Sequence, residues 1–300
     1  MIKRRDFIKI TALTGLGLSL PQGLIRIAEC AAAANVDLAV ASGTSPEMIT
    51  RAAINALGGI GNFISRGDIV VVKPNIAWDR TPEQAGNTNP EVVATVVKLC
   101  FEAGARKVKV FDRPVNDPRR CYVQSGIADA ARASGAAVNF VDERKFRDMT
   151  IKGNTLKTWP LYTEVFEADK VINVPIAKHH GLAKLTLSMK NWMGIMGGAR
   201  NRIHQRIDES LVDIAMTVKP TLTVLDAVRI LTANGPQGGS LSDVKMMNMV
   251  IAGTDQVAID SFGATLFGMK GADLGYVRLG AQSGFGVMDL NRLNIKKISA

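Results

Sequence analysis

The sequence predicts an α/β domain with a mostly parallel sheet and helices on both faces. Short β-branched runs alternate along the chain with amphipathic segments of helical length. Residues 68–72 are apolar apart from the first, as expected for a strand that is covered on both faces. A chain of 300 residues with 47% hydrophobic residues also supplies an ample core for one such domain.

The first 33 residues are predicted to be an export signal. Arg4 and Arg5 are followed by Phe7 and Lys9, then by a moderately apolar run and a stretch of alanines. This order of charged, apolar and small residues matches a twin-arginine signal peptide. The apolar run is too short to span a membrane as a mature helix, although an uncleaved N-terminal anchor is the alternative. We therefore expect a periplasmic or otherwise exported protein whose residues 34–300 form one α/β domain without a stable membrane span.

Charge composition favours an anionic partner. The chain carries 37 basic and 27 acidic residues, and removal of the five basic and two acidic residues of the predicted signal leaves a net charge of +7. A basic surface attracts anionic ligands. Nucleic acid is a poor candidate because only 5% of the residues are aromatic and no basic run resembles a reading motif.

Cysteine content limits the cofactors. Only Cys100 and Cys121 follow the predicted signal, and two thiols cannot supply the four ligands of an iron–sulfur cluster. They can form one disulfide in an oxidising compartment. Alternatively, Cys100 lies among apolar neighbours in a predicted helix and is a small buried hydrophobic residue.

The first half of the domain is expected to alternate strands and helices. Ser45 and Asn89 are candidate N-caps, each followed by a proline at the first helical position, and Gly104 is a helix stop signal. The expected strands are Asp37–Ala41, Asp68–Val72, Lys107–Phe111 and Ala137–Val141, and the expected helices are Pro46–Leu57, Pro90–Ala103 and Tyr122–Ser134.

The second half continues this alternation after a small hairpin predicted at residues 149–158. A loop and a mixed helical segment ending at Lys190 and Asn191 are expected after Pro175. The further strands are Lys170–Val174, Thr221–Leu225, Met246–Ile251 and Leu293–Ile298, and the further helices are Leu161–Glu167, Asp208–Thr217, Asp255–Phe267 and Leu274–Ser283. The similar runs IVVVKPNIAWD and VINVPIAKHHG indicate either two pseudo-repeated halves or a coincidence of strand-end chemistry.

Polar side chains follow the predicted strands where each strand ends. Because right-handed crossovers bring the carboxyl ends of parallel strands to one edge, where ligands bind, these side chains are expected to share one rim. The residues concerned are Lys73, Asn75, Asp112, Arg113, Lys178, His179, His180 and Asp226. Lysine at such a position can bind a carboxylate or phosphate, whereas Asn75 can instead form an Asx turn.

Two of the chain's three histidines, His179 and His180, are adjacent. Neighbouring residues in an extended segment point to opposite sides, so one of the pair is expected at the ligand. We select His179 as the acid–base group, because histidine titrates near neutral pH; a structural, hydrogen-bonded role is the alternative for each. His204, the third histidine, is expected to close over the ligand.

A glycine-rich basic turn follows Lys190 and Asn191. Gly197 and Gly198 free backbone amides that can cradle an anion, and Arg200 adds positive charge. The turn lacks the end of a Walker motif. It is either an anion-binding loop or a mobile solvated turn.

Several motifs resemble, in order and spacing over residues 37–298, the domain of unknown function 362 family. They are Lys73-Pro74-Asn75, Lys178-His179-His180, the run SMKNWMG at 188–194, Asn234-Gly235-Pro236 with Gly238, and the run TDQVAID at 254–260. Gln256 replaces the family's usual proline at a helix start. Many relatives carry a ferredoxin-like cysteine segment with two four-iron clusters. This chain has no C-x-x-C, so no iron–sulfur cluster is expected, and any other cofactor stays open.

The leading hypothesis is a protein that binds a small carboxylate or phosphate, and that acts on it with His179 and Lys190 as catalytic residues and with Lys73 and Lys190 as charge clamps. The expected ligand-binding residues are Lys73, Asn75, Lys178, Asn191, Arg200, His204 and Asp226. A non-catalytic binding or accessory protein of a redox complex, with a redox protein as partner, is the second hypothesis. The third is a metal-dependent enzyme with zinc on His179, His204 and Asp226.

Overall fold

The computed structural model describes residues 36–300, so the predicted signal at residues 1–33 lies outside the described part of the chain. The strands are β1 (Leu38–Ser42), β2 (Ile69–Pro74), β3 (Lys107–Val110), β4 (Ala137–Val138), β5 (Phe146–Thr150), β6 (Thr158–Tyr162), β7 (Lys170–Val174), β8 (Ile176–His180), β9 (Lys184–Thr186), β10 (Leu222–Leu231), β11 (Val244–Gly253) and β12 (Ile295–Ser299). The helices are α2 (Pro46–Ala56), α3 (Pro90–Glu102), α4 (Pro118–Gln124), α5 (Ile127–Ala133), α6 (Glu164–Glu167), α7 (Ser188–Asn191), α8 (Ile207–Val218), α9 (Gln256–Thr265) and α10 (Gly275–Gln282).

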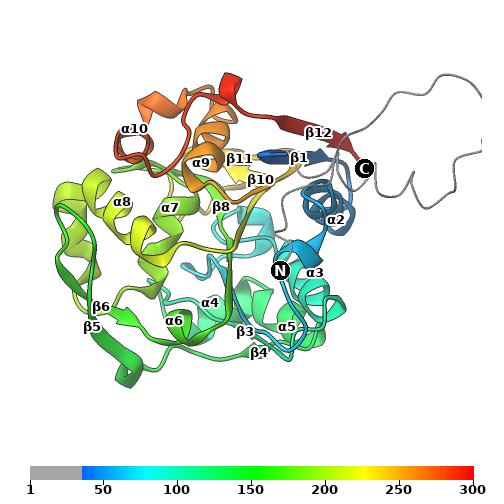
Figure 1. Cartoon of the computed structure of the whole chain (residues 1–300), viewed down its shortest axis with the longest axis horizontal. Coiled ribbons are helices and arrows are strands. Elements are labelled where there is room, and N and C mark those ends of the chain that lie inside the picture. The colour runs from blue at the N-terminus through cyan, green and yellow to red at the C-terminus, as the bar shows by residue number, and fades with distance from the viewer. Residues whose placement is uncertain (1–35) are drawn as a thin grey trace, which may run out of the picture.

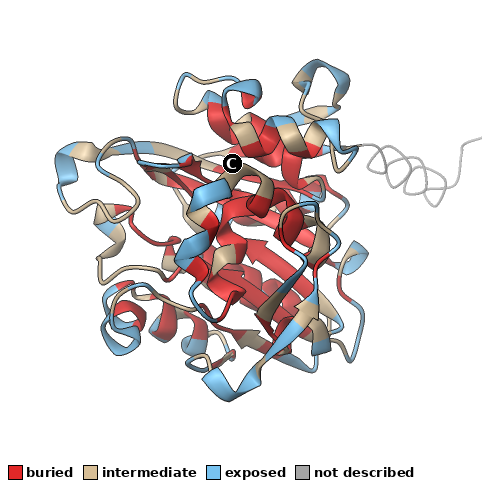
Figure 2. Ribbon diagram, turned by 90° about the vertical axis from the view of Figure 1, so that its left-hand side faces the viewer, coloured by how far each residue is buried: buried red, intermediate tan, exposed pale blue. Residues whose placement is uncertain are grey.

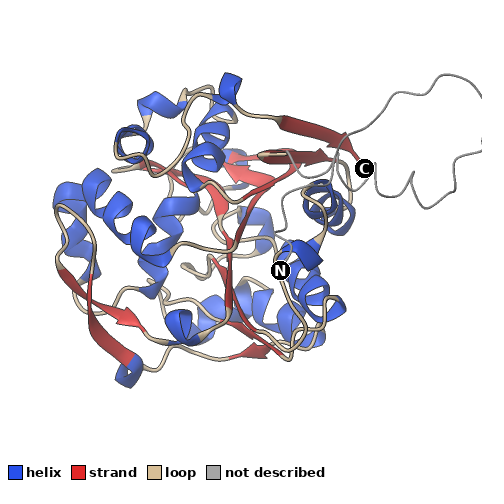
Figure 3. Ribbon diagram, viewed as in Figure 1, coloured by secondary structure: helices blue, strands red, loops and turns tan. Residues whose placement is uncertain are grey.

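A ten-stranded sheet runs through the centre of the domain (Figures 1 and 3). Its order is β12-β1-β11-β10-β7-β2-β3-β4, and β8 and β9 continue from β10 beside this path. The strands β10, β7, β2, β3 and β4 pair in parallel, whereas β11 is antiparallel to both of its neighbours. The predicted α/β fold with a mostly parallel sheet is therefore confirmed.

Helices cover both faces of the sheet, and each face has its own apolar cluster (Figure 2). The central strand β2 shows the alternation: Val70 and Val72 belong to the cluster under α2, α3 and α5, and Val71 belongs to the cluster under α8, α9 and α10. Successive strand residues point to opposite faces, so a strand that is buried on both faces must be apolar throughout. This explains the run of valines in the sequence.

Helix starts follow the predicted capping chemistry. The side chains of Ser45 and Asn89 accept hydrogen bonds from the backbone N–H groups of Met48 and Glu91. Asp255 caps α9 in the same way, so Gln256 stands at the start of that helix as expected. Caps of this kind stabilise a helix by about 1 kcal/mol.

The expected helix Tyr122–Ser134 is wrong as one element. It is divided into α4 and α5 by Gly126, whose φ of 68° lies in the left-handed region that ends a helix. Tyr122 therefore belongs to α4.

The segment after Pro175 also differs from the prediction. Instead of a loop and most of the expected helical segment, β8 and β9 form a hairpin in which Lys178 pairs with Thr186 and His180 with Lys184. Only the end of the expected helix is present, as α7. The hairpin belongs to the central sheet because the first residues of β10 pair with β7 and its later residues pair with β8. As a result β10 is ten residues long, and Asp226 lies in its interior and not at its end.

Both cysteines of the described region, Cys100 and Cys121, are buried and free. Burial raises the pKa of the Cys100 thiol to about 12 and that of Cys121 to about 11. Within residues 36–300 we find no helix whose length and apolar character would allow it to cross a membrane.

Candidate functional site

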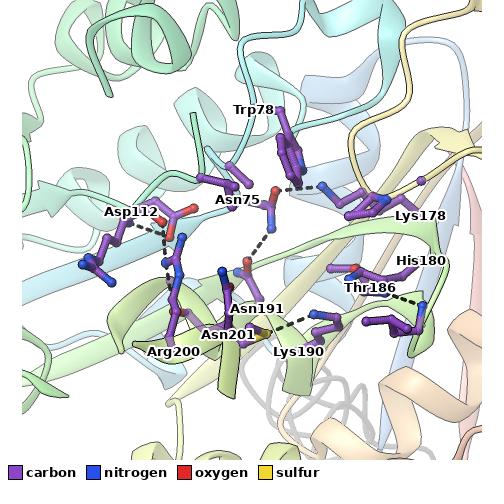
Figure 4. Close-up of a pocket in the computed structure, with 18 of the residues that line it drawn as sticks. Asn75, Trp78, Asp112, Lys178, His180, Thr186, Lys190, Asn191, Arg200 and Asn201 are labelled. Atoms are coloured by element: carbon purple, nitrogen blue, oxygen red, sulfur yellow. Dashed lines mark hydrogen bonds between the residues drawn. The ribbon is translucent and has the colours of Figure 1, made fainter. Parts of the chain in front are cut away.

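A cavity of about 380 Å³ opens where β2, β3 and β8 end, beside the end of α7 (Figure 4). Five cationic side chains and one carboxylate line it: Lys73, Arg113, Lys178, Lys190 and Arg200, with Asp112. Asn75, Asn191, Thr186, His180 and His204 add polar groups, and Trp78, Val115, Leu182 and Met193 add apolar ones. The structure thus brings together most of the side chains that were predicted to share one rim.

Lys73 and Asp112 form a buried ion pair, with Nζ 2.8 Å from the carboxylate. The amine also donates to the carbonyl oxygen of Pro74 at 2.8 Å and to the side-chain oxygen of Asn191 at 3.0 Å, so each of its three N–H groups has an acceptor. Asp112 also accepts from the backbone N–H of Ile76. We call this group, Lys73, Asp112 and Asn191, the paired side of the cavity.

The paired side is closed by Gly194. A Cβ atom at this position would collide with the Asp112 carboxylate and the Lys73 amine. Its carbonyl oxygen accepts a hydrogen bond from the backbone N–H of Arg113 at 3.0 Å. Glycine is therefore needed here for close approach of the backbone to the ion pair.

A chain of buried asparagines links the ends of three strands. Lys178 donates to the side-chain oxygen of Asn75, Asn75 donates to Asn191, and Asn191 donates to Asn173 in β7 (Figure 4 shows the first two bonds). Asn173 in turn donates to Ser188 at the start of α7. Since each amide both donates and accepts, the chain fixes the positions of the lysines it contacts.

Lys178 is almost completely buried and has two oxygen acceptors but no carboxylate. Its amine donates to Asn75 at 3.1 Å and to the carbonyl oxygen of Gly86 at 2.5 Å. Burial, helped by the nearby charge of Lys190, lowers the pKa of Lys178 to about 7. Burial also lowers the pKa of Lys73, and Asp112 opposes that effect.

Lys190, on α7, has fewer hydrogen-bond acceptors than Lys73 and Lys178. The residue is only 6% exposed, and the sole hydrogen-bond acceptor of its amine within residues 36–300 is the sulfur of Met193 at 3.0 Å. A thioether is a weak acceptor. Burial, followed by the charge of Arg200, lowers the pKa of Lys190 to about 7.

Thr186 and His180 lie near Lys190 around the same cavity (Figure 4). The Thr186 hydroxyl is buried and has no hydrogen-bond partner in the described structure. The Nδ1 atom of His180 accepts from the backbone N–H groups of Leu182 and Ala183, both at 3.1 Å, so the ring proton is on Nε2. We call Lys190, Thr186 and His180 the unpaired side of the cavity.

His180 is a fixed neutral donor. Burial, followed by the charge of Lys190, lowers the pKa of its imidazole to about 2. The ring stacks on that of His204 with centroids 5.9 Å apart, and burial lowers the pKa of His204 as well. His204 also lines the cavity, and neither ring gains a carboxylate that would favour its charged form.

Arg200 lies at the cavity but is already occupied. Its guanidinium donates to the carbonyl oxygens of Arg113, Met193 and Pro114 at 2.7–3.1 Å. The glycine-rich turn is thus held to the strand end after β3. Arg200 therefore contributes positive charge to the cavity, whereas most of its hydrogen-bond donors are already used within the protein.

The expectation that His179 and Asp226 reach the rim site is wrong. Neither lines the cavity, because His179 follows the side-chain alternation of β8 away from Lys178 and His180, and its Nδ1 accepts from the backbone N–H of Gly235. Asp226, inside β10, accepts from the backbone N–H groups of Asn89 and Val228, which ties the start of α3 to the sheet. Burial raises the pKa of this carboxyl to about 6.

The zinc ligands proposed from the sequence are not brought together, since His204 stacks on His180 and Asp226 binds backbone amides. In residues 36–300 no three histidine, cysteine, aspartate or glutamate side chains are close enough together to hold a metal ion. Asp260 of α9 accepts from the backbone N–H groups of Ser188 and Met189 and so caps α7, the helix of Lys190.

Four residues at or behind the cavity did not stand out in the sequence: Thr186, Trp78, Met193 and Asn173. Asn173 carried a signal, because it is a single amide in the buried run VINV and a buried amide needs partners. Thr186 carried none, since a threonine in a β-strand is ordinary.

The comparisons with known proteins identify a family. The model of a domain of unknown function, DUF362, matches residues 70–265. A thylakoid-associated protein of Synechocystis sp. is 30% identical over 218 residues, which are 70% of this chain and 66% of that protein.

Two solved structures show a general likeness. The lactate racemase apoprotein of Thermoanaerobacterium thermosaccharolyticum matches with a TM-score of 0.46 and 13% identity, over 80% of this chain and 57% of that one. A protein of Thermotoga maritima matches with a TM-score of 0.39 and 8% identity, over 80% of this chain and 60% of that one. The chain spans less than two thirds of the length of each of these relatives.

Proposed function

Because the chain belongs to the DUF362 family, whose description assigns no activity, we propose its function from the cavity: it binds a small organic or inorganic anion that carries a carboxylate or a phosphate. The ligand lies at the carboxyl ends of the parallel strands. Clefts outside this edge are the usual ligand sites of α/β sheets.

The observation that carries this proposal is the missing countercharge on the unpaired side. Lys190 is buried beside Lys178 and Arg200, yet it contacts no carboxylate in the described structure. A buried cation is costly unless an anion or several acceptors compensate it. An anionic ligand would supply a countercharge and oxygen acceptors, and it would raise the pKa of Lys190 toward its ordinary range.

The neutral donors of the unpaired side complete the anion site. The Thr186 hydroxyl and the Nε2–H of His180 are available to donate to ligand oxygens, and both belong to the cavity lining. Donors held in place before the ligand arrives lose little freedom on binding. The paired side contributes fixed charge, because the acceptors of Lys73 are already within the protein.

An enzymatic role on the bound anion would rest on Lys190 and not on a histidine. Acid–base catalysis requires a group that titrates near the working pH. Lys190 has a pKa of about 7, whereas the pKa of His180 is about 2 and His179 lies away from the cavity. We therefore transfer the acid–base role that the sequence suggested for His179 to Lys190, with His180 as a hydrogen-bond donor.

We also propose that the protein is exported by the twin-arginine route, on the evidence of Arg4, Arg5 and Phe7. An Arg4→Lys, Arg5→Lys variant should remain in the cytoplasm at its full length. Export of this variant at the wild-type level would contradict the proposal.

Anion binding is tested by thermal shift and titration calorimetry with phosphate, acetate, oxalate and succinate. We expect at least one of them to raise the melting temperature of the wild-type protein and not that of Lys190→Met. Lys98→Met, which removes an exposed lysine of α3, is the matched control and should respond like the wild type. If none of the anions distinguishes wild type from Lys190→Met, the proposed function is wrong.

A further inference from the structure

The three buried lysines of the cavity differ in what their amines contact. Lys73 has three oxygen acceptors, one of them a carboxylate, and Lys178 has two. Lys190 has only the sulfur of Met193. Hydrogen bonds to oxygen stabilise the charged form of an ammonium group. Among the three lysines, the charged form of Lys190 is therefore the least stabilised.

An amine becomes a nucleophile when it is neutral and can reach its target. Desolvation next to other cations is the arrangement that activates lysine for imine formation. Lys190 is buried, faces the charges of Lys178 and Arg200, and lines a cavity large enough for a small organic molecule. The lowered pKa of Lys190 agrees with this geometry.

The surroundings of Lys190 fit a carbonyl substrate that also carries a negative charge. Lys178 lines the same cavity and can face a carboxylate. His180 offers a neutral Nε2–H and Thr186 a hydroxyl without a partner, and such donors polarise a carbonyl oxygen. Both donors are neutral, so they can stabilise a developing oxyanion by hydrogen bonding without adding charge to the cavity.

We propose that Lys190 forms an imine with a 2-oxo acid bound in this cavity. The neutral amine attacks the carbonyl carbon, so a C–N bond forms and the carbonyl electron pair moves to the oxygen. A proton passes from nitrogen to that oxygen. The hydroxyl group then takes up a proton from solvent and leaves as water while the nitrogen lone pair forms the C=N bond. The resulting iminium returns its N–H proton to solvent and becomes the imine. One amine and one carbonyl give one imine and one water, and no oxidant or reductant takes part.

This inference rests on the proposed anion site but makes a separate claim about Lys190. The probe is glyoxylate, the smallest 2-oxo acid, with cyanoborohydride to reduce the imine to a stable carboxymethyl-lysine. Labelled residues are mapped by peptide mass spectrometry at about pH 7, where ordinary lysines are almost fully protonated. We expect about tenfold more label on Lys190 than on exposed Lys98, and protection of Lys190 by whichever plain anion stabilises the protein.

Two comparisons sharpen the experiment. Propanal has the carbonyl but no charge, so it should label Lys190 less than glyoxylate does. Lys190→Arg keeps a cation in the cavity but cannot form an imine, so it should retain stabilisation by anions while losing the label. Mapping of the wild-type protein gives the answer even if a variant does not fold.

The outcomes separate the two proposals. Label spread over surface lysines with Lys190 unmodified, while anions still stabilise the protein, overturns imine formation and leaves the anion site standing. Equal labelling of Lys190 by propanal and glyoxylate, without protection by anions, overturns recognition of a 2-oxo acid. Absence of both label and anion stabilisation overturns the inference together with the proposed function.

Discussion

The paired and unpaired sides of one cavity place the same residue type in opposite situations. On the paired side Lys73 has a carboxylate, an amide and a carbonyl oxygen within 3.0 Å. On the unpaired side Lys190 is buried as well but meets a thioether. The comparison indicates that hydrogen-bond acceptors distinguish a structural buried lysine, such as Lys73, from Lys190, which we propose contacts a ligand.

The largest loss of stability is expected from Gly194→Ala, which disrupts the ion pair between Lys73 and Asp112. The new methyl group would displace Asp112 from Lys73 and leave two buried charges without their counter-ions. Separation of a buried pair costs about 3–5 kcal/mol, so the free energy of unfolding in urea should fall by that amount. In Gly61→Ala the added Cβ meets no atom within 4 Å, and this control should unfold almost as the wild type does. Equal losses in the two variants would mean that the ion pair tolerates displacement.

Replacement of a cavity lysine by methionine should have opposite effects on the free energy of unfolding on the two sides. Lys73→Met leaves the Asp112 carboxylate buried without its cation and should lower the free energy of unfolding by about 3 kcal/mol. Lys190→Met removes a charge that has no partner and should raise the ligand-free value by about 1 kcal/mol. Chemical denaturation without added anions measures both. A loss of stability in Lys190→Met comparable to that in Lys73→Met would remove the distinction between the sides.

The pH dependence of stability should reveal the unpaired charge. The pKa of Lys178 and of Lys190 is about 7 in the folded protein and 10.5 as the ordinary value, so between these pH values the folded state binds fewer protons than the unfolded chain. The free energy of unfolding therefore rises with pH across this window, and the destabilising effect of the two buried charges is complete below pH 7.

Lys190→Met should remove at least about half of the rise that these two lysines cause, because Lys178 also loses a neighbouring charge that lowers its pKa. The difference between variant and wild type therefore measures the effect of Lys190 both directly and through Lys178. An anion that binds wild type should flatten the rise too, because it keeps Lys190 protonated. Identical pH profiles for wild type and Lys190→Met would show that Lys190 titrates normally.

The smallest expected effect concerns two hydroxyls. Thr186 and Thr223 each have a buried hydroxyl without a partner, but only Thr186 lines the cavity. Replacement of either by valine should change the free energy of unfolding by less than about 1 kcal/mol, because no hydrogen bond is lost. Thr186→Val should weaken anion binding about fivefold in calorimetry, whereas Thr223→Val should leave it unchanged. Equal affinities in the two variants would exclude Thr186 from the ligand contacts.

The sequence contained enough information for the sheet and for most of the site, because both depend on local patterns. Runs such as VVV in β2 fix a strand that is covered on both faces, and the polar residues directly after it must lie at its carboxyl end. Lys73, Asn75 and Lys178 were found in this way and lie at the cavity, as does Asn191, which was selected at the end of a predicted helical segment.

The errors came from positions where distant pairing decides. Nothing next to His179 reveals that the segment becomes a strand beside β10, and a strand fixes which of two adjacent histidines faces the ligand. Asp226 was misplaced for the same reason: β10 continues past it because a second partner strand, β8, is available. The thioether contact of Lys190 likewise depends on Met193 and on the fact that no carboxylate of the described structure contacts its amine. The nearby carboxylate of Asp260 accepts from backbone N–H groups of α7 instead.

The pairing of β1 has a consequence for how this protein is made. β1 lies between β11 and β12, and the backbone N–H of Asn294 reaches the carboxylate of Asp37 across a sequence separation of 257. During synthesis β1 leaves the ribosome long before either partner strand exists, so this edge of the sheet closes only after residues 295–299 have been made. A route that threads unfolded chains would have to move β1 unpaired, whereas the proposed twin-arginine route accepts the domain after the edge has closed.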